Sequence, residues 1–330
     1  MDKAEKHMKK PKNPMTPPLL PSALRTLLLM LVATVGFFSQ PARALEVRFE
    51  PVAPGVYAHI GDKGGRSVEN EGLNANIGLL VTPAGAVLID SGATFASARK
   101  IHDAVKAVTS QPLRWVINTG GQDHRWLGNS YFQGTGAQVI AHTNARADMQ
   151  SRGGEQLASL RALLGPAAEG TTAVLPSRWI EGPVERLNLG GTVIELHHAG
   201  GGHTPGDLLV WLPQAGVLFS GDVIYVDRML GVIPVSNTRA WLASLARVES
   251  LQPAIIVPGH GSVTTLAVAR LQTRDYLLAL RAHMKKAVDD GVDVSAAVRS
   301  FDGARWMGLL NAAELAPGNA SRTYLEVERE

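Results

Sequence analysis

The fold of this chain is decided by one stretch, which reads Thr119-Gly120-Gly121-Gln122-Asp123-His124-Arg125-Trp126-Leu127-Gly128-Asn129. It follows residues 113–118, a short apolar segment typical of a buried strand. Polar side chains placed directly after a buried strand stand on a loop that a rigid scaffold presents to a ligand. The carboxylate of Asp123 and the imidazole of His124 are therefore candidates for a functional site, and such a site needs partners from other strands.

Three more polar loops follow apolar strands in the second half of the sequence. They read Gly202-His203-Thr204-Pro205-Gly206-Asp207, Phe219-Ser220-Gly221-Asp222 and Pro258-Gly259-His260-Gly261. Glycine on both sides of His260 suits a close approach of the backbone to a site. His203 stands on a glycine-flanked loop, where Thr204 or Asp207 can serve as its hydrogen-bonding partner. Each loop alone also fits an ordinary surface turn, but their order and spacing indicate a common site.

The rest of the sequence alternates between strand and helix patterns. Residues 95–108 have helical periodicity, and residues 266–287 are expected to form one long amphipathic helix. A helix over residues 146–164 is expected to be interrupted at Gly153-Gly154. Because the order of strands and helices repeats in two halves, the sequence predicts an α+β fold. Two β-rich halves with helices outside would form a four-layer αββα sandwich.

Together with Ile89-Asp90-Ser91-Gly92, these loops resemble the metallo-β-lactamase-fold hydrolases, over about residues 52–287. Within that superfamily the sequence is most similar to the periplasmic quinoprotein relay system zinc metallohydrolases. The stretches that carry this similarity are residues 52–57 (Val-Ala-Pro-Gly-Val-Tyr), 69–72 (Glu-Asn-Glu-Gly) and 319–329 (Asn-Ala-Ser-Arg-Thr-Tyr-Leu-Glu-Val-Glu-Arg). The resemblance implies an αββα sandwich with a metal cleft between its two halves.

The resemblance also assigns roles to the loop residues. It implies that His203 binds a first metal ion, that Asp222 bridges two ions and that His260 binds the second. Asp90 is implied to be a buried residue that fixes the loop geometry without touching metal. Thr204 and Asp207 are expected to support His203 in the same indirect way.

The first motif departs from the pattern of this superfamily, which reads Thr-His-x-His-x-Asp-His, then two residues, then Gly-Asn. Aligned without a gap, Gly120 and Gln122 replace the two histidines, His124 takes the aspartate position and Arg125 the last histidine position. A shift of one residue lets Asp123 and His124 keep the roles of the family's Asp-His pair. The sequence leaves both registers open, and we favour Asp123 and His124 as a working pair.

In either register the first metal site has lost its two histidines. His203 with an amide from Gln122 is a poor zinc site, because zinc sites supply three or four good ligands. The second site can still be assembled from four ligands, namely Asp123, His124, Asp222 and His260. We therefore expect one zinc ion rather than two, and oxygen-rich ligation would also admit Mn or Fe.

The expected chemistry is metal-dependent hydrolysis of a small ester, thioester, lactone or lactam. Asp123 is the candidate general base, and His203 is a candidate to bind substrate or to stabilise developing negative charge. Gln122 and Arg125 are candidate substrate contacts, with Arg125 directed at an anionic group. The alternative is a metal-poor pseudoenzyme or ligand-binding protein that uses the same cleft, because fold alone does not fix function.

The first 44 residues have the pattern of a signal peptide. A lysine-rich start is followed by a short apolar run at residues 27–38 and by Ala42-Arg43-Ala44, which resembles a cleavage site. We expect domains at 1–44 (signal peptide), 45–290 (metallo-β-lactamase-fold domain) and 291–330 (a C-terminal extension packed on it). The apolar run is too short for a membrane span. A periplasmic or secreted protein with no stable membrane span is predicted.

Composition narrows the classes of partner and ligand. The 330-residue chain has 45% hydrophobic residues and no cysteine, so a large core is available and thiolate metal sites are excluded. Its net charge is +3, but residues 1–44 hold seven Lys and Arg against two Asp and Glu, which leaves the remainder at −2. Without a basic stripe, nucleic acid is not an expected partner, and a small-molecule substrate is.

Overall fold

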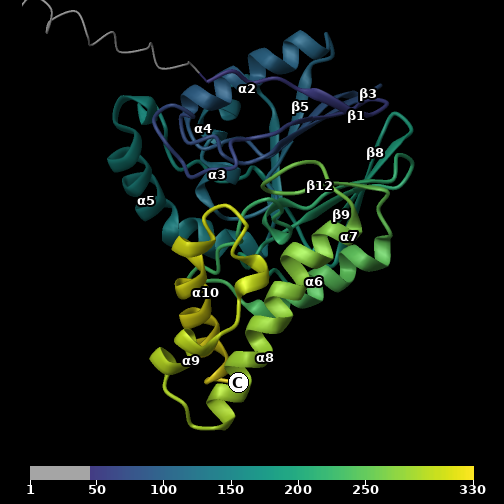
Figure 1. Cartoon of the computed structure of the whole chain (residues 1–330). Helices are drawn as coiled ribbons and strands as arrows, with labels where there is room; N and C mark the ends of the chain where they lie inside the picture. Colours follow the sequence, from purple (N-terminus) through teal and green to yellow (C-terminus); the bar gives the residue numbers. More distant parts are fainter. Residues whose placement is uncertain (1–44) are drawn as a thin grey trace, which may run out of the picture. The chain divides into compact units, whose positions relative to one another are not determined.

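The computed structural model describes residues 45–330, so the predicted leader over residues 1–44 lies outside the described residues. Two β-sheets face each other, and helices cover the outer face of each sheet (Figure 1). This arrangement confirms the predicted four-layer α+β sandwich. No helix within residues 45–330 is both long and apolar enough to cross a bilayer.

The first sheet contains seven strands that follow one another in sequence order. They are β1 (Glu50–Ala53), β2 (Val56–His59), β3 (Ile77–Thr82), β4 (Gly85–Ile89), β5 (Leu113–Ile117), β6 (Gln138–His142) and β7 (Arg178–Ile180). The pairs from β1 to β4 are antiparallel, and those from β4 to β7 are parallel. Because parallel neighbours need crossover connections, this half also contains the helices α2 (Phe95–Val108), α3 (Asp123–Trp126), α4 (Asn129–Phe132) and α5 (Asn144–Leu164).

The second sheet contains five strands in the order β12-β11-β10-β9-β8. They are β8 (Val184–Leu189), β9 (Thr192–His197), β10 (Leu209–Leu212), β11 (Val217–Phe219) and β12 (Ile255–Val257). The pairs from β8 to β11 are antiparallel, whereas β11 and β12 are parallel. The connection between β11 and β12 contains the 3₁₀ turn η3 (Gly221–Val223) and helix α6 (Thr238–Leu251).

Three apolar layers hold the sandwich together. Between the sheets, side chains such as Val87 and Ile117 of the first sheet pack with Leu196, Val210 and Phe219 of the second. Outside the first sheet, Ile101 and Val105 of α2 pack on Leu79, Leu88 and Val116. Outside the second sheet, Trp241 and Leu245 of α6 pack on Trp211 and Leu218. The i, i+4 spacing of the α2 side chains explains why the predicted helix over residues 95–108 forms.

Two helix predictions need correction. Helix α5 continues through Gly153 without the expected interruption, because that glycine leaves room for the indole of Trp126; a Cβ there would lie 2.9 Å from the ring. The helix expected over residues 266–287 consists of α7 (Leu266–Ala269), a π-helical turn η4 (Arg270–Arg274) and α8 (Asp275–Asp289). The π turn places Thr273 where its hydroxyl bonds both backbone groups of Tyr225.

The C-terminal residues form α9 (Val294–Ser300), the 3₁₀ turn η5 (Ala304–Trp306) and α10 (Ala312–Val327). Helix α10 lies along α8, and Figure 1 shows both below the second sheet. Asn319 of α10 bonds the backbone N–H of Val232 and the carbonyl of Leu230. The remaining 3₁₀ turns are η1 (Gln133–Thr135) and η2 (Gly165–Ala168).

Candidate metal centre

The candidate site is built where parallel strands end. Asp90 follows β4, Asp222 lies in η3 after β11, and His260 follows β12. Because the carboxyl ends of parallel strands meet at the same edge of a sheet, the topology collects these loops on one side of the molecule. Asn76 fastens the two halves there, since its side-chain nitrogen donates to the carbonyls of Pro258 and Gly261, both at 2.8 Å.

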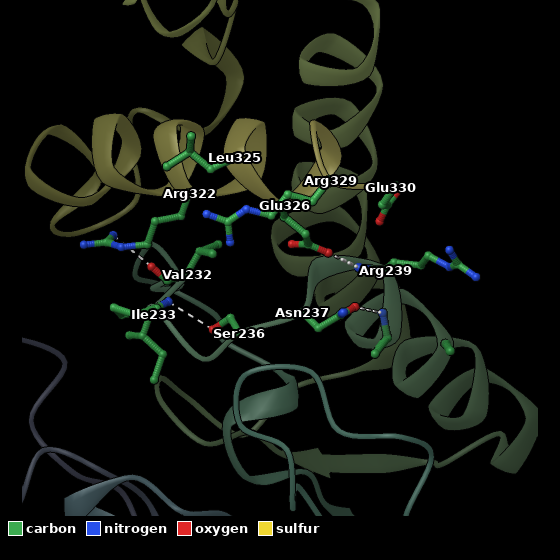
Figure 2. Close-up of a pocket in the computed structure, with 13 residues that line it drawn as sticks. Val232, Ile233, Ser236, Asn237, Arg239, Arg322, Leu325, Glu326, Arg329 and Glu330 are labelled. Carbon is green, nitrogen blue, oxygen red and sulfur yellow. Dashed lines mark hydrogen bonds between the residues drawn. The ribbon is translucent and has the colours of Figure 1, made fainter. Parts of the chain in front are cut away.

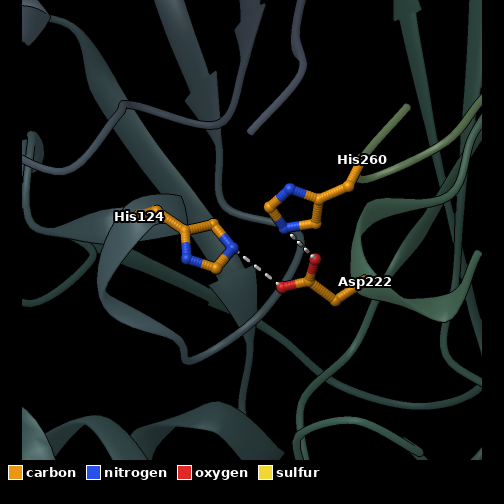
Figure 3. Close-up of side chains that lie close together, drawn as sticks. All are labelled: His124, Asp222 and His260. Atoms are coloured by element: carbon orange, nitrogen blue, oxygen red, sulfur yellow. Dashed lines mark hydrogen bonds and ion pairs between the residues drawn. The ribbon is translucent and has the colours of Figure 1, made fainter. Parts of the chain in front are cut away.

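Three buried side chains converge at this edge (Figure 3). Nε2 of His124 lies 3.1 Å from Oδ2 of Asp222, and Nε2 of His260 lies 3.2 Å from Oδ1 of the same carboxylate. Each of the three residues is at most 3% exposed. Each offers one ligand atom, and these atoms all lie within 4.8 Å of one another. The residues come from α3, η3 and the loop after β12, so the group exists only in the folded chain.

The outer nitrogen of His260 fixes which of its nitrogens faces Asp222 with a lone pair. Nδ1 of His260 lies 2.8 Å from the carbonyl oxygen of Asn74, which only accepts, so this nitrogen donates. Nε2 of a neutral His260 then faces Asp222 with its lone pair, an arrangement that suits a cation bound between them. Carboxylate oxygens flank both nitrogens of His124, since Nδ1 lies 3.2 Å from Oδ1 of Asp123 and Nε2 lies 3.1 Å from Oδ2 of Asp222.

The size of the group also fits a metal ion. Bonds of about 2.0–2.2 Å around tetrahedral zinc place neighbouring ligand atoms roughly 3.3 Å apart. The two separations between imidazole nitrogen and carboxylate oxygen, 3.1 and 3.2 Å, are close to that value. Burial lowers the pKa of His260 to about 3 and also lowers the pKa of His124, a direction that favours the neutral form in which imidazoles bind metal.

Arg125 lies directly behind this group and is itself 1% exposed. Its Nη2 donates to Oδ1 of Asp222 at 2.6 Å and its Nη1 to Oδ2 of Asp90 at 2.8 Å. Nε reaches Oδ2 of Asp222 at 3.2 Å, and the two remaining N–H groups bond the carbonyls of Asn76 and Gly259. All five N–H groups of the guanidinium are therefore used within the protein.

This finding corrects the prediction that Arg125 contacts an anionic substrate group. Burial opposes the charge of Arg125, but the carboxylates of Asp222 and Asp90 more than compensate and raise its pKa above the ordinary value. In return, although burial acts against ionisation of Asp222, Arg125 holds the pKa of that carboxyl well below its usual range. Arg125 is thus a buried counter-ion that keeps Asp222 ionised and oriented, with no N–H left for a ligand.

The position of the first metal site has a different composition. Gln122 contacts His203 through its side-chain oxygen and the ring Nε2, while Gly120 contributes no side chain. Nε2 of His203 lies 3.9 Å from Oδ2 of Asp222, and burial lowers the pKa of His203 to about 4. One imidazole with one amide does not fit zinc. The contact between Gln122 and His203 is the placement expected from the alignment without a gap.

Thr204 and Asp207 brace the loop that carries His203. Oδ2 of Asp207 accepts from the backbone N–H of His203 at 2.8 Å, and Oδ1 accepts from the hydroxyl of Thr204. The hydroxyl oxygen of Thr204 also accepts from the N–H of Gly121 at 3.1 Å. These contacts connect the His203 loop with the 119–129 loop. Asp90 has a comparable place, because its carboxylate bonds both Arg125 and Thr119.

Asp123 lies beside the three-residue group but outside it. Its Oδ1 accepts from the backbone N–H of His124 at 2.8 Å, and its Oδ2 pairs with Nη1 of Arg66. The expectation that Asp123 ligates the metal is therefore corrected: its carboxylate supports His124 and faces the loop over residues 61–72. With Asp123 committed in this way, the structure offers three ligands rather than the four expected from the sequence.

Three residues near the site, Arg66, Tyr225 and Arg228, were not predicted from the sequence. Arg66 of the loop over residues 61–72 reaches Asp123, and the loop is held by Nη1 of Arg228, which donates to the carbonyl of Gly64 at 2.8 Å. Nε of Arg228 is buried and has no hydrogen-bond partner in residues 45–330. Tyr225 stacks on His260 with ring centroids 4.9 Å apart. No motif marked these residues, because they reach the site through tertiary packing alone.

A cavity of about 410 Å³ adjoins Arg66 and the start of α3. Its lining includes Arg66, Gln122, Asp123, Arg152 and Pro234. Gln122 therefore faces both His203 and the cavity, as a substrate-contacting side chain would. Volumes of this size are typical of sites for small molecules.

Comparisons with known proteins agree with this geometry. The family model described as the metallo-beta-lactamase superfamily matches residues 70–260. The type 2 metallo-beta-lactamase of Bacillus cereus is 26% identical over 215 residues, which are 63% of this chain and 73% of that protein. The type 2 metallo-beta-lactamase of Bacteroides fragilis is 32% identical over 79 residues, 23% of this chain and 32% of that protein.

Solved structures show the same fold. The DIM-1 metallo-beta-lactamase superposes with a TM-score of 0.55 at 19% identity, and the match covers 68% of this chain and 94% of that one. A metallo-beta-lactamase from Pontibacter korlensis gives a TM-score of 0.54 at 21% identity, covering 68% and 95%. The family-model match over residues 70–260 contains His124, Asp222 and His260.

Proposed function

Because this chain belongs to the metallo-beta-lactamase superfamily, we propose that it is a metal-dependent hydrolase that works with a single metal ion. The ion would be held by His124, Asp222 and His260. Zinc is the expected ion, with Mn or Fe as alternatives that the oxygen and nitrogen ligands also accept. The substrate would be a small ester, thioester, lactone or lactam.

One observation carries this proposal, namely the convergence of two buried imidazoles on one buried carboxylate. Nε2 of His124 and Nε2 of His260 lie 3.1 and 3.2 Å from the oxygens of Asp222, and one ligand atom from each residue lies within 4.8 Å of the others. The carbonyl of Asn74 accepts from Nδ1 of His260, and outer partners of this kind orient metal-binding histidines.

When bound, zinc would lower the pKa of water to about 7 and polarise the bond to be cleaved. The residues of the chain prepare the site for that chemistry. Arg125 keeps Asp222 ionised, and Asp90 balances the charge of Arg125. Asp123 is the nearest carboxylate that can accept a proton from the reacting water, once Arg66 moves away from it. His203 is neutral and stands ready to hold a polar group of the substrate.

The surroundings of the cavity favour a substrate that carries an anionic group. Arg66 lines the cavity, and burial, together with the nearby charge of Arg228, lowers the pKa of Arg66. An anionic group on the substrate would lie beside the Arg66 guanidinium and stabilise its charge.

The proposed location is the periplasm or the cell exterior. It rests on the lysine-rich start, the apolar run and the small residues of residues 1–44. Membership of the quinoprotein relay system subfamily is likewise a proposal, supported by the sequence stretches at residues 52–57, 69–72 and 319–329.

Metal analysis of the purified protein tests the proposal. We expect about one metal ion per chain after loading with zinc, and loss of that ion in Asp222→Ala and in His260→Ala. His283→Ala is the matched control, because His283 bonds Ala297 and Ser300 on the far side of α8. Failure to bind any metal under all loading conditions would overturn the enzyme proposal.

A metal-poor ligand-binding protein is the second candidate, and the Arg125 contact favours it. The guanidinium already neutralises Asp222 without a metal ion. If the zinc-loading experiment finds no metal while the fold is intact, the cleft serves binding rather than hydrolysis.

A further inference from the structure

A second cavity, of about 800 Å³, lies between the loop at residues 232–237, the start of α6 and the last turns of α10 (Figure 2). Helix α10 lies outside residues 70–260, the segment that matches the family model. One wall of this cavity is therefore formed by α10, which follows the family-matched segment, whereas the candidate metal ligands lie inside that segment. Its volume is in the range of small-molecule sites.

Three arginines line this cavity, namely Arg239, Arg322 and Arg329. None of them makes an ion pair with another residue in the described part of the chain. The guanidinium groups of Arg322 and Arg329 lie on the same side of Glu326 in Figure 2, while Arg239 points away from them. Arg322 uses one nitrogen to bond the carbonyl of Val232, and its other donors are available.

The acidic residues of the cavity do not balance these arginines, because they are already paired. Glu326 accepts from the N–H groups of Thr238 and Arg239 at the start of α6, and from Nη1 of Arg281 at 3.0 Å. Nη2 of Arg281 binds Glu330 at 2.8 Å. The start of α6 and the one charge of Arg281 thus offset part of the charge of these two carboxylates. Together with the three lining arginines, Arg281 gives four positive charges against two negative ones, so the cavity keeps an excess of positive charge.

Part of the lining of the cavity is apolar. Ile233, Pro234 and Ala243 line it from the loop and from α6, and Leu325 lines it from α10 with 39% of its surface exposed. A purely ionic ligand would leave these groups in contact with water. The combination of apolar wall and arginine pair is suited to a molecule with an apolar body and one anionic end.

The loop between the two cavities is a shared wall. Ile233 and Pro234 line this cavity and also the cleft lined by Arg66, Gln122 and Asp123. In the same loop, the hydroxyl of Ser236 donates to the carbonyl of His203 at 2.9 Å. An occupant of the α10 cavity would therefore contact the same residues that shape the cleft.

We propose that the cavity under α10 is a second binding site, which takes a small organic anion with an apolar body. Its carboxylate lies between Arg322 and Arg329, where the planar guanidinium groups can form paired hydrogen bonds. Its apolar body lies against Ile233 and Pro234. The site needs neither the metal nor the hydrolytic activity proposed above.

Binding of 4-phenylbutyrate, measured by isothermal titration calorimetry, tests this site, with 4-phenylbutan-1-ol as the uncharged counterpart. We expect saturable binding of the carboxylate, binding of the alcohol weaker by about tenfold or more, and weaker carboxylate binding as salt is raised. Arg329→Ala should weaken carboxylate binding by about tenfold, and Arg322→Ala should act in the same direction. Arg299→Ala is the control, since Arg299 is an exposed arginine of α9 outside the cavity.

The outcomes are decisive in both directions. Equal binding of the acid and the alcohol, unchanged binding in both cavity variants, or no saturable binding would overturn the proposal. Measuring binding in Asp222→Ala as well keeps this result independent of the metal centre, because a failed hydrolase would still bind the probe.

Discussion

Nη2 of Arg125 donates to Oδ1 of Asp222 at 2.6 Å, and Nε of the same side chain reaches Oδ2 at 3.2 Å. This two-point contact fixes the plane of the Asp222 carboxylate. The same two oxygens lie beside the imidazoles, with Nε2 of His124 3.1 Å from Oδ2 and Nε2 of His260 3.2 Å from Oδ1. A carboxylate held in this way has one orientation in which to accept a cation.

The first prediction concerns removal of this counter-ion. Arg125→Met should destabilise the fold by about 3–5 kcal/mol, because it leaves Asp90 and Asp222 as unpaired buried charges. Urea unfolding at pH 7 measures the loss. Adding Asp90→Asn to the same variant should recover part of it, since one of the two orphaned charges is removed. An unchanged unfolding midpoint in Arg125→Met would contradict the buried ion-pair network.

The second prediction concerns the lost first metal site. In Gly120→His with Gln122→His, zinc stoichiometry should rise toward two per chain, because the new imidazoles join His203 at the position where Gln122 now touches it. A Cβ on Gly120 would lie 3.0 Å from Asp207 and 3.2 Å from Thr204, so the double variant should also be less stable. Stoichiometry that stays at one would favour the shifted register.

The third prediction uses a glycine beside the guanidinium. A Cβ on Gly259 would lie 2.4 Å from the carbonyl oxygen of Gly221 and 2.5 Å from Nη2 of Arg125. Gly259→Ala should therefore cost about 1–3 kcal/mol in unfolding free energy. Gly134→Ala is the control, because no heavy atom lies within 4 Å of the added methyl there. Equal midpoints for the two variants would show that the site can relax around the methyl group.

The fourth prediction concerns pH. The rings of His142 and His198 stack with centroids 3.7 Å apart. Burial, with the neighbouring His198, lowers the pKa of His142 to about 4 from an ordinary value of 6.5. A histidine with a lowered pKa contributes stability above pH 6.5, and that contribution is lost as the pH falls toward 4. His142→Gln should therefore show a shallower fall in urea midpoint over this interval, and a fall as steep as that of the unmodified protein would contradict it.

The fifth prediction concerns access to the buried ligands. Arg66 pairs with Asp123 from the loop over residues 61–72, in front of the buried triad. In Arg66→Ala, zinc should be lost to an excess of chelator several-fold faster, because the loop loses its contact with α3. Lys63→Ala is the matched control, since Lys63 lies on the same loop but pairs with Asp227. Equal rates in both variants would show that Arg66 does not restrict access.

Much of the fold could be predicted from local patterns. The apolar strand runs and the spacing in residues 95–108 indicated the sandwich and α2 correctly, because those residues pack as their periodicity suggests. The interruption expected at Gly153 was wrong. A glycine weakens a helix locally, but the missing side chain of Gly153 here makes room for the ring of Trp126. The π turn at Arg270–Arg274 could not be predicted, because the spacing of apolar residues in that segment is that of an ordinary α-helix.

The site was predictable only in part, and for a physical reason. His124, Asp222 and His260 stand after strands, so the topology brings them together as expected. Arg125 was misassigned because a charged residue on a short loop is normally exposed, and the two carboxylates that neutralise it are 35 and 97 positions away in the chain. Arg66 and Tyr225 reach the site through contacts that have no counterpart in sequence spacing.

The chain completes all seven strands of the first sheet before it begins the five of the second. During synthesis, apolar side chains such as Val87 and Ile117 therefore stay unburied until Leu196, Val210 and Phe219 have been made. The metal triad is delayed further, since His260 comes after the last strand. A ribosome-bound chain that ends at β7 can thus neither close the core between the sheets nor bring His124, Asp222 and His260 together. Because the inner face of the first sheet stays without its partner until the second sheet is made, the half-made sandwich is the species in which aggregation would compete with folding.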